Sequence, residues 1–157
     1  MAAACGAARA HHTVDMSQPP SAFQRDFTLQ ELREGLELVH EASTAALAAH
    51  GYDEGAMFAI RLAIEEAVVN AFRHGNRNDP TKVVFFRACV DGVEAVFEIE
   101  DQGPGFDPKA IPDPTDQFNI EMPSGRGVML IKAYMTEAEY IPPGNRLRMV
   151  YRKPQAS

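Results

Sequence analysis

The sequence predicts an α+β fold, a two-layer sandwich in which a mostly antiparallel, mixed sheet carries its helices on one face. The prediction rests on the order of local patterns along the chain, β-α-α-β-β-loop-α-β-β. Helical segments show apolar residues at intervals of three and four, whereas strand segments alternate apolar and polar residues. The length of 157 residues suits one domain, which we place at residues 21–153, between a flexible extension at 1–20 and a short tail at 154–157.

One short strand and two helices are expected before residue 80. Residues 21–28 are predicted to form a strand with two phenylalanine anchors. Apolar residues then recur at helical spacing over residues 29–50, and Gly51 is expected to end that helix. A second helix is predicted from residue 53 or 54 to about residue 74, because the run 75–80 contains glycine and proline and breaks the pattern.

A hairpin is the strongest local prediction in the middle of the chain. Residues 82–90 and 93–101 both alternate like strands, and Asp91-Gly92 joins them. Asp-Gly between two alternating segments is a strong signal for a tight hairpin turn. The proline-rich residues 102–124 show little periodicity, so we expect a long loop, and such loops inside a compact domain are usually functional or disordered.

The chain is predicted to close with a helix and a second hairpin. Residues 125–134, GRGVMLIKAY, have glycines at the start of a helical pattern. Residues 137–142 and 145–153 then alternate like strands on either side of a Pro-Gly-Asn turn. Both hairpins favour antiparallel pairing within the sheet.

Composition narrows the classes of partner. The formal net charge is −7 and the chain has no basic stripe, so nucleic acid is not expected as a partner. We find neither a signal peptide nor a membrane-spanning segment, so we expect no membrane partner. The two cysteines, Cys5 and Cys89, have neither metal-binding spacing nor the pattern of a disulfide framework, so we expect reduced thiols in a cytoplasmic protein.

The first group of candidate functional residues lies on the second predicted helix. Glu66, Asn70 and His74 are four residues apart, so their side chains stack along one stripe at the edge of the apolar face. An asparagine has no helix-propensity reason to lie in mid-helix. A carboxylate and an amide one turn apart can serve as a base and as an oxygen ligand for Mg²⁺. The alternative is a set of ordinary solvated side chains.

The second group follows the strand that ends the first hairpin. Every second residue of this strand is apolar until Asp101 takes a position that should enter the core. A buried carboxylate has to be paired or hydrogen-bonded, and Gly103 and Gly105 leave room for a ligand to approach the backbone. The pattern is typical of a carboxylate that binds the edge of a flat heterocycle. The alternative is an aspartate that caps a turn at the end of the strand.

The third group is SGRGV, residues 124–128. Glycines at the start of a helix leave unpaired N–H groups and the positive end of the helix dipole available for a phosphate. The Walker-type motif and the common protein-kinase motifs are absent from the sequence, so a nucleotide site would be of another type. The alternative is an ordinary glycine-rich helix start.

Together and in this order, the three groups resemble the GHKL superfamily of histidine-kinase-like ATPases, which have a Bergerat-type ATP-binding fold. The segments IEEAVVNAFRHGN, DQGPGFDP and SGRGVMLIKAYMTE are similar to those of the bacterial anti-sigma-factor serine/threonine kinases. The resemblance covers about residues 21–153, nearly the whole chain.

The resemblance implies a role for each candidate residue. Glu66 would be the catalytic general base, and Asn70 would bind Mg²⁺ that bridges the phosphates of ATP. Asp101 would accept a hydrogen bond from the adenine amine, and the loop 112–124 would close over the phosphates as a lid. The remaining ATP-binding residues would flank the base or contact the phosphates: Arg73, Gly103, Gly105, Gly125, Arg126 and Gly127.

The resemblance also implies an activity and partners. We expect a serine/threonine kinase that phosphorylates a small antagonist protein and, when free, sequesters a sigma factor. Related kinases act as homodimers, and the apolar stripe of helix 29–50 is compatible with an interface or with packing on the domain's own sheet. Two alternatives stay open. One is an ATP-binding module that grips a partner without phosphoryl transfer, and the other is a kinase that regulates a different signalling protein.

Overall fold

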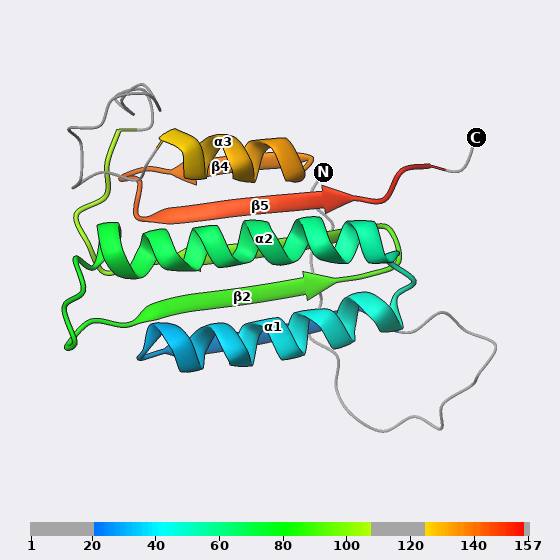
Figure 1. Ribbon diagram of the computed structural model, residues 1–157, viewed down its shortest axis with the longest axis horizontal. Coiled ribbons are helices and arrows are strands. Elements are labelled where there is room, and N and C mark those ends of the chain that lie inside the picture. Colours follow the sequence, from blue (N-terminus) through cyan, green and yellow to red (C-terminus); the bar gives the residue numbers. More distant parts are fainter. Residues whose placement is uncertain (1–20, 108–124, 156–157) are drawn as a thin grey trace.

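The computed structural model describes residues 21–107 and 125–155, which fold into two layers (Figure 1). One layer is a five-stranded sheet with the order β1-β2-β3-β5-β4. Its strands are β1 (Phe23–Leu29), β2 (Val84–Val90), β3 (Glu94–Glu100), β4 (Glu137–Ile141) and β5 (Arg146–Arg152). The other layer comprises α1 (Leu32–Ala49), α2 (Glu54–Asn70) and α3 (Gly125–Tyr134), which lie side by side on one face of the sheet (Figure 1). The predicted α+β two-layer fold is confirmed.

The sheet differs from the prediction in one respect. All four strand pairings in the described residues are antiparallel, so this sheet is not mixed. The predicted elements are present with boundaries shifted by a few residues. The largest shift is at the first helix, because Leu29 pairs with Val84 as the last residue of β1 and the helix begins only at Leu32. Leu29 therefore enters the core from a strand.

The core lies between the sheet and the helices because alternate strand residues face the helical layer. In β2 and β3 every second side chain is buried, as the alternating sequence predicts. Phe86 and Phe97, from these two strands, place their ring centroids 6.0 Å apart at the centre of the sheet. On α2, Ile60 and Ile64 are completely buried. Burial of this helix face fixes the rotation of α2, and with it the direction of the polar residues along its edge.

The predicted hairpin turn at Asp91-Gly92 is confirmed, and the side chain of Asp91 stabilises it. Asp91 Oδ1 accepts hydrogen bonds from the N–H groups of Val93 at 2.7 Å and Glu94 at 2.8 Å. Gly92 is not among the residues with positive φ in the described chain. The turn is therefore stabilised by side chain-to-backbone hydrogen bonds rather than by a left-handed glycine.

The second helix reaches the predicted region near His74, but its last turn is not α-helical. Residues Ala71–Gly75 form a π-helical turn, η1, and the N–H of Asn76 donates to the carbonyl of Ala71 at 2.8 Å. A π-turn adds one residue to the helical turn and changes the direction in which the following side chains point. Such turns are frequent at functional sites.

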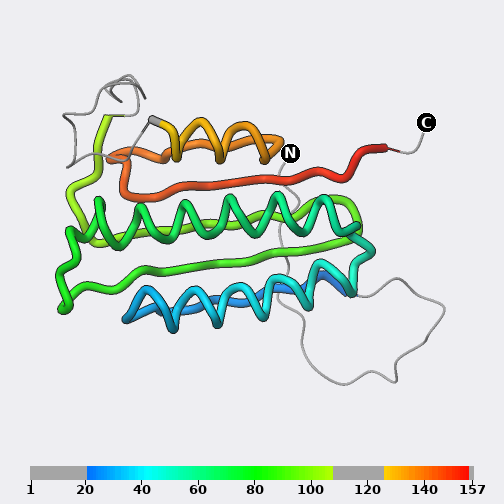
Figure 2. Tube along the Cα trace, in the orientation of Figure 1, coloured from blue at the N-terminus to red at the C-terminus, as the bar shows by residue number. Residues whose placement is uncertain are grey.

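One end of the sandwich collects segments that are far apart in the sequence (Figure 2). They are the π-turn after α2, the segment that follows β3, the β4–β5 turn and the first turn of α3. The predicted lid, 112–124, and the predicted extension, 1–20, lie outside the described residues. No helix within the described ranges is long and apolar enough to cross a membrane.

Candidate functional site

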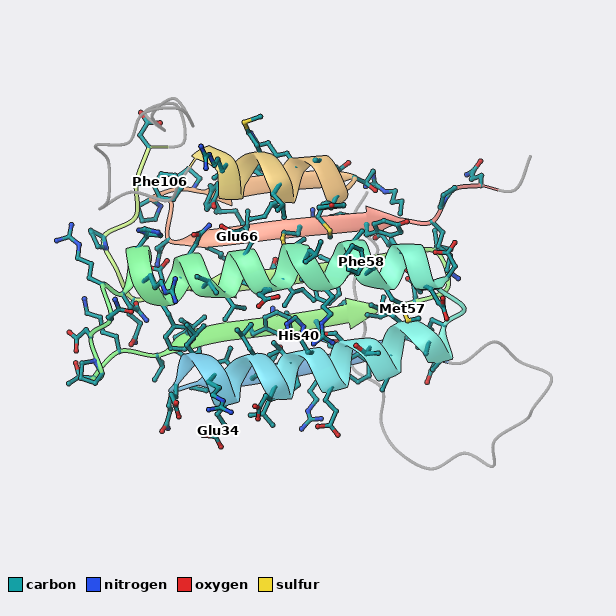
Figure 3. All side chains as sticks on the ribbon, in the orientation of Figure 1. Glu34, His40, Met57, Phe58, Glu66 and Phe106 are labelled. Carbon is teal, nitrogen blue, oxygen red and sulfur yellow. The ribbon has the colours of Figure 1, made fainter. Side chains whose placement is uncertain are left out.

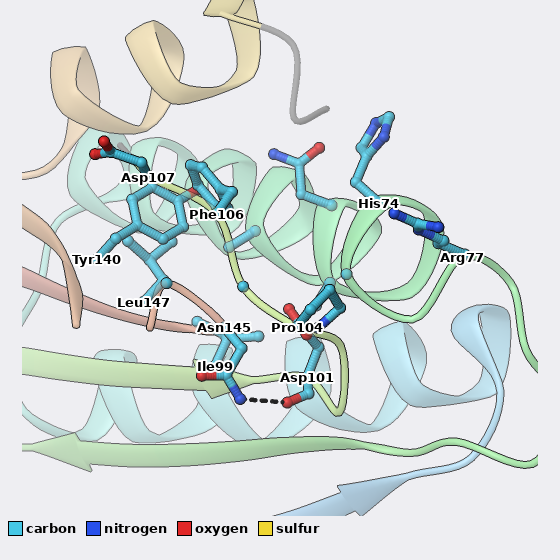
Figure 4. Close-up of a pocket in the computed structure, with 16 residues that line it drawn as sticks. His74, Arg77, Ile99, Asp101, Pro104, Phe106, Asp107, Tyr140, Asn145 and Leu147 are labelled. Atoms are coloured by element: carbon cyan, nitrogen blue, oxygen red, sulfur yellow. Dashed lines mark hydrogen bonds between the residues drawn. The ribbon is translucent and has the colours of Figure 1, made fainter. Parts of the chain in front are cut away.

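A pocket with a volume of about 330 Å³ opens at this end of the molecule (Figure 4). Its walls come from α2 with the π-turn, from the end of β3 with the residues that follow it, and from the β4–β5 hairpin. Small-molecule sites usually measure about 300–1,000 Å³, so the pocket is at the lower end of that range. Among the predicted site residues, Asn70, Asp101 and Gly105 line it.

Asp101 directly follows β3, and its half-buried side chain lines the pocket together with Ile99. Its backbone N–H donates to the carbonyl of Asn145 at 2.9 Å, and its carbonyl accepts from Asn145 Nδ2 at 2.9 Å (Figure 4). Among the described residues, the carboxylate accepts one bond, from the N–H of Gly103 at 2.8 Å. Burial raises the pKa of Asp101 to about 6, and the bond from Gly103 opposes that rise.

Close packing around Asp101 requires glycines. A Cβ on Gly75 would overlap the Asp101 carboxylate, and a Cβ on Gly103 would overlap the carbonyl oxygen of Gly75. Gly105 has a φ of +79°, and a Cβ there would overlap the carbonyl oxygen of Pro143 in the β4–β5 turn. In the structure, the first role of Gly103 and Gly105 is thus to let chain segments approach each other. Their contact with a nucleotide base stays a prediction.

A second cluster lies where α2 meets the first turn of α3. Glu66 is half-buried on the edge of α2 that faces α3 (Figure 3). A Cβ on Gly127, which is buried in α3, would overlap Glu66 Oε1 and lie 3.1 Å from Asn70 Nδ2. The structure therefore brings together the predicted base, the predicted Mg²⁺ ligand and the predicted phosphate-binding helix start.

Asn70 links the two clusters, because it also lines the pocket. Its side chain is 7% exposed, and its Nδ2 atom is buried without a hydrogen-bond partner among the described residues. A buried polar group without a partner costs roughly 1–3 kcal/mol. Such an exception calls for a ligand, an ion or a water molecule. The amide can turn about its last bond, so either its oxygen or its nitrogen can face a bound group.

The structure also places three other residues that were predicted to contact the phosphates. Arg73 is exposed on the π-turn and Arg126 is exposed in the first turn of α3, and neither lines the pocket. Gly125 is the first residue of α3. The roles of these three residues stay predictions, and both arginines would have to swing toward a ligand from the surface.

An aromatic pair at the pocket was not predicted from the sequence. Phe106 and Tyr140 line one end of the pocket and make a T-shaped contact with ring centroids 4.7 Å apart (Figure 4). Burial, together with the negative charges of Asp101 and Glu66, raises the pKa of Tyr140 well above its usual value, so the phenol stays neutral. Strand alternation in the second hairpin could have placed Tyr140 on the helix side, but nothing local shows that β4 ends beside residue 106.

The opposite end of the pocket is polar. His74 and Arg77 lie there (Figure 4), and only His74 was noted as part of the Glu66 stripe. Burial lowers the pKa of His74, and the neighbouring charge of Arg73 lowers it further, so the imidazole is neutral at pH 7. Asn145, which holds the backbone of Asp101, was also missed, since its only sequence signal is its place after a Pro-Gly turn.

Comparison with known proteins agrees with this geometry. The family model of the histidine kinase-like ATPase domain matches residues 29–151, which include α1, α2, α3 and every residue that lines the pocket. Among curated proteins, no match to the chain was found.

Proposed function

The chain belongs to the histidine kinase-like ATPase family, and we propose that it is a serine/threonine protein kinase of a partner-switching system. In this proposal it uses ATP to phosphorylate a small antagonist protein in the cytoplasm and, when free, binds a sigma factor as a homodimer. The family match indicates an ATP-binding, kinase-like ATPase domain. The observation that supports phosphoryl transfer most directly is the meeting of Glu66, Asn70 and Gly127 at the start of α3.

The pocket suits the adenine base of ATP. Asp101 offers a carboxylate acceptor for an exocyclic amine, and Ile99 and Leu147 contribute apolar surface to the lining. With a pKa of about 6, the carboxylate of Asp101 is mostly ionised at pH 7 to 8 and can accept that bond. A single directional acceptor among apolar walls is the usual way in which a pocket combines affinity with specificity.

The phosphates would lie between the pocket and α3. Asn70 stands at that junction with a buried amide that has no partner among the described residues, and it would hold the metal ion. The N–H groups in the first turn of α3 present the positive end of the helix dipole to an anion. When bound, ATP with Mg²⁺ supplies the phosphoryl group and neutralises its charge.

Glu66 is the general base in this proposal. Its carboxylate lies against the first turn of α3, where Gly127 leaves room for it. There it can accept the proton of a serine or threonine hydroxyl of the antagonist. A correctly placed general base contributes about 10²–10⁴-fold to the rate.

Phosphorylation of the antagonist tests the proposal. We expect the purified chain to transfer phosphate from ATP to a serine or threonine of a candidate antagonist encoded near its gene, detected by mass spectrometry. Glu66→Ala should lower the transfer rate by about 10²–10⁴-fold and leave ATP affinity within a few-fold, because a base acts only in the transition state. Glu65→Ala is the matched control, since Glu65 is the exposed neighbour on the same helix, and should transfer at the wild-type rate.

Other outcomes would redirect the proposal. ATP binding without transfer to any tested antagonist would favour a binding module. Transfer to a protein unrelated to sigma factors would favour a kinase of another signalling pathway. Light scattering at tens of micromolar tests the homodimer, and a monomer at that concentration would contradict this part of the proposal.

A further inference from the structure

Asn76, the residue that follows the π-turn, is the most deeply buried polar side chain of the described residues, at 1% exposure. It does not line the pocket. Its Nδ2 donates to the carbonyl of Val83 at 2.9 Å, and its Oδ1 accepts from the N–H of Gln102 at 2.7 Å. Both ends of this amide are therefore engaged within the protein, in contrast to the amide of Asn70.

These bonds join three segments that are distant in the sequence. Asn76 closes the π-turn through its own N–H, Val83 precedes β2, and Gln102 follows Asp101. Gln102 adds a second link, because its Oε1 accepts from the N–H of Val83 at 2.8 Å. The end of α2, the start of β2 and the end of β3 are thus held in one hydrogen-bonded network.

The network ends at the peptide bond that follows Asp101. The carbonyl of that peptide accepts from Asn145 Nδ2 at 2.9 Å, and its N–H, from Gln102, donates to Asn76 Oδ1 at 2.7 Å. Gly75, the neighbour of Asn76, lies so close to the Asp101 carboxylate that a Cβ would overlap it. The backbone from which the Asp101 side chain projects is therefore held from both sides.

We propose that Asn76 is a positioning residue of the nucleotide pocket: by binding the N–H of Gln102, it keeps Asp101 directed at the amine of adenine. The inference rests on the proposed binding of ATP. An acceptor that is held in place before the ligand arrives loses less conformational freedom on binding. Asparagine suits this position because one side chain supplies both the donor for Val83 and the acceptor for Gln102.

Calorimetric titration of the full chain with ATP and Mg²⁺ tests the role. Asn76→Ala should weaken ATP binding by about tenfold or more, as loss of the hydrogen-bond partner of a ligating residue does at metal sites. Gln102→Ala is the matched control. It removes the bond to Val83 but keeps the N–H that Asn76 holds, so ATP affinity should stay close to that of the wild type.

A nucleotide without the exocyclic amine distinguishes the positioning of Asp101 from a general disturbance of the pocket. Purine riboside triphosphate lacks the exocyclic amine, so the wild type should prefer ATP over it, and Asn76→Ala should lose most of that preference. If Asn76→Ala weakened both nucleotides by the same factor, the proposed role would be overturned. A wild type that binds neither nucleotide would overturn both the proposed function and this inference, whereas unchanged ATP binding in Asn76→Ala would overturn this inference alone.

A second variant serves if Asn76→Ala does not fold. Asn76→Asp keeps an oxygen that accepts from the N–H of Gln102 but loses the donor to Val83. We expect it to retain the preference for ATP, with folding checked by thermal melting without nucleotide. Loss of that preference at a melting temperature near that of the wild type would contradict the proposed link through Gln102.

Discussion

The two ends of the sandwich both bring distant segments together, but their buried polar groups differ. At the end away from the pocket, the hydroxyl of Tyr52 donates to the carbonyl of Asp91 at 2.9 Å. The ring nitrogens of His50 lie 2.8 Å and 3.1 Å from two backbone carbonyl oxygens. Lys153 donates to the carbonyl of His50, and its Nζ lies 4.5 Å from the centroid of the Tyr52 ring. This end is a closed network of protein groups.

At the pocket end, some buried polar groups have fewer hydrogen-bond partners than buried groups usually have. Asn70 Nδ2 is buried and has no partner among the described residues, and burial raises the pKa of Asp101 to about 6. Buried polar groups are normally satisfied, because each unsatisfied one lowers stability. A buried polar residue therefore marks a binding site where it lacks a partner among the described residues and also lines a pocket, as Asn70 does.

The largest expected effect would come from Asn70→Ala, which removes the unpaired amide. We expect Mg²⁺-dependent ATP affinity to fall on the order of a hundredfold, because losing a metal ligand should cost at least as much as losing the hydrogen-bond partner of one. The free energy of unfolding without nucleotide should stay the same or rise, since this Nδ2 has no described protein partner to lose and an unpaired buried group lowers stability. Calorimetry and urea denaturation measure the two quantities.

Ser43→Ala is the control for this comparison. The Oγ atom of Ser43 is also buried without a partner among the described residues, but Ser43 belongs to α1 and does not line the pocket. ATP affinity should be unchanged in this variant. An equal loss of affinity in both variants would show that the effect of Asn70→Ala does not depend on its place in the pocket.

Asp101→Asn should have the next largest effect. At pH 8 we expect ATP affinity to fall by about tenfold or more, because the amide can present its NH₂ group where an acceptor is needed. Asp26→Asn is the control, since Asp26 is exposed on the open face of the sheet and pairs with Arg87. Wild-type affinity in Asp101→Asn, measured by calorimetry, would rule out the adenine contact.

The same substitution should alter the pH dependence of stability. Burial raises the pKa of Asp101 in the folded state to about 6, from the ordinary 3.8 of an aspartate. The contribution of Asp101 to the free energy of unfolding is therefore complete below about pH 4, and it is lost as the pH rises through about 6. Relative to the wild type, Asp101→Asn should lack this loss between pH 4 and 7. Parallel curves of unfolding free energy against pH for the two proteins would argue against the burial of this carboxylate.

A smaller effect is expected when a glycine near the pocket is replaced by alanine, and none when a glycine at the far end of the sandwich is replaced in the same way. Gly127→Ala should displace the Glu66 carboxylate, because the new Cβ would overlap its Oε1. Phosphoryl transfer should then fall several-fold, with little loss of thermal stability, since a long side chain can rotate away. Gly92→Ala, in the far hairpin, meets no atom within 4 Å and should leave transfer unchanged in the same kinase assay. Similar transfer rates in both variants would contradict the placement of Glu66.

The smallest effect should come from Tyr52→Phe at the far end. Loss of the hydroxyl bond to Asp91 should lower the free energy of unfolding by about 1 kcal/mol, the typical contribution of one hydrogen bond. ATP affinity should not change, because Tyr52 is remote from the pocket lining. Urea denaturation measures the first effect, with the exposed Tyr134→Phe as a control. A loss of ATP affinity would show that the two ends are coupled.

The placement of several candidate site residues could be predicted, because it follows from local sequence patterns. The spacing of Glu66 and Asn70 places both on one edge of a helix, and the alternation of β3 directs Asp101 toward the helical layer. These inferences need only the geometry of a single helix or strand. The π-turn escaped prediction because the same residues also continue an α-helical pattern up to Gly75, and only the bond from Asn76 to Ala71 distinguishes the two.

By itself, the sequence determined the helices, the strands, both hairpins and the polar residues that interrupt their apolar faces, since periodicity and turn chemistry act over a few residues. Only the tertiary structure decided which segments meet. The strand order β3-β5-β4 places Tyr140 and Asn145 beside the residues that follow β3, although they are about forty residues away in sequence. The same packing sets Gly127 against Glu66 and Asn76 against Gln102. Such contacts depend on how complete elements pack, and no local pattern carries that information.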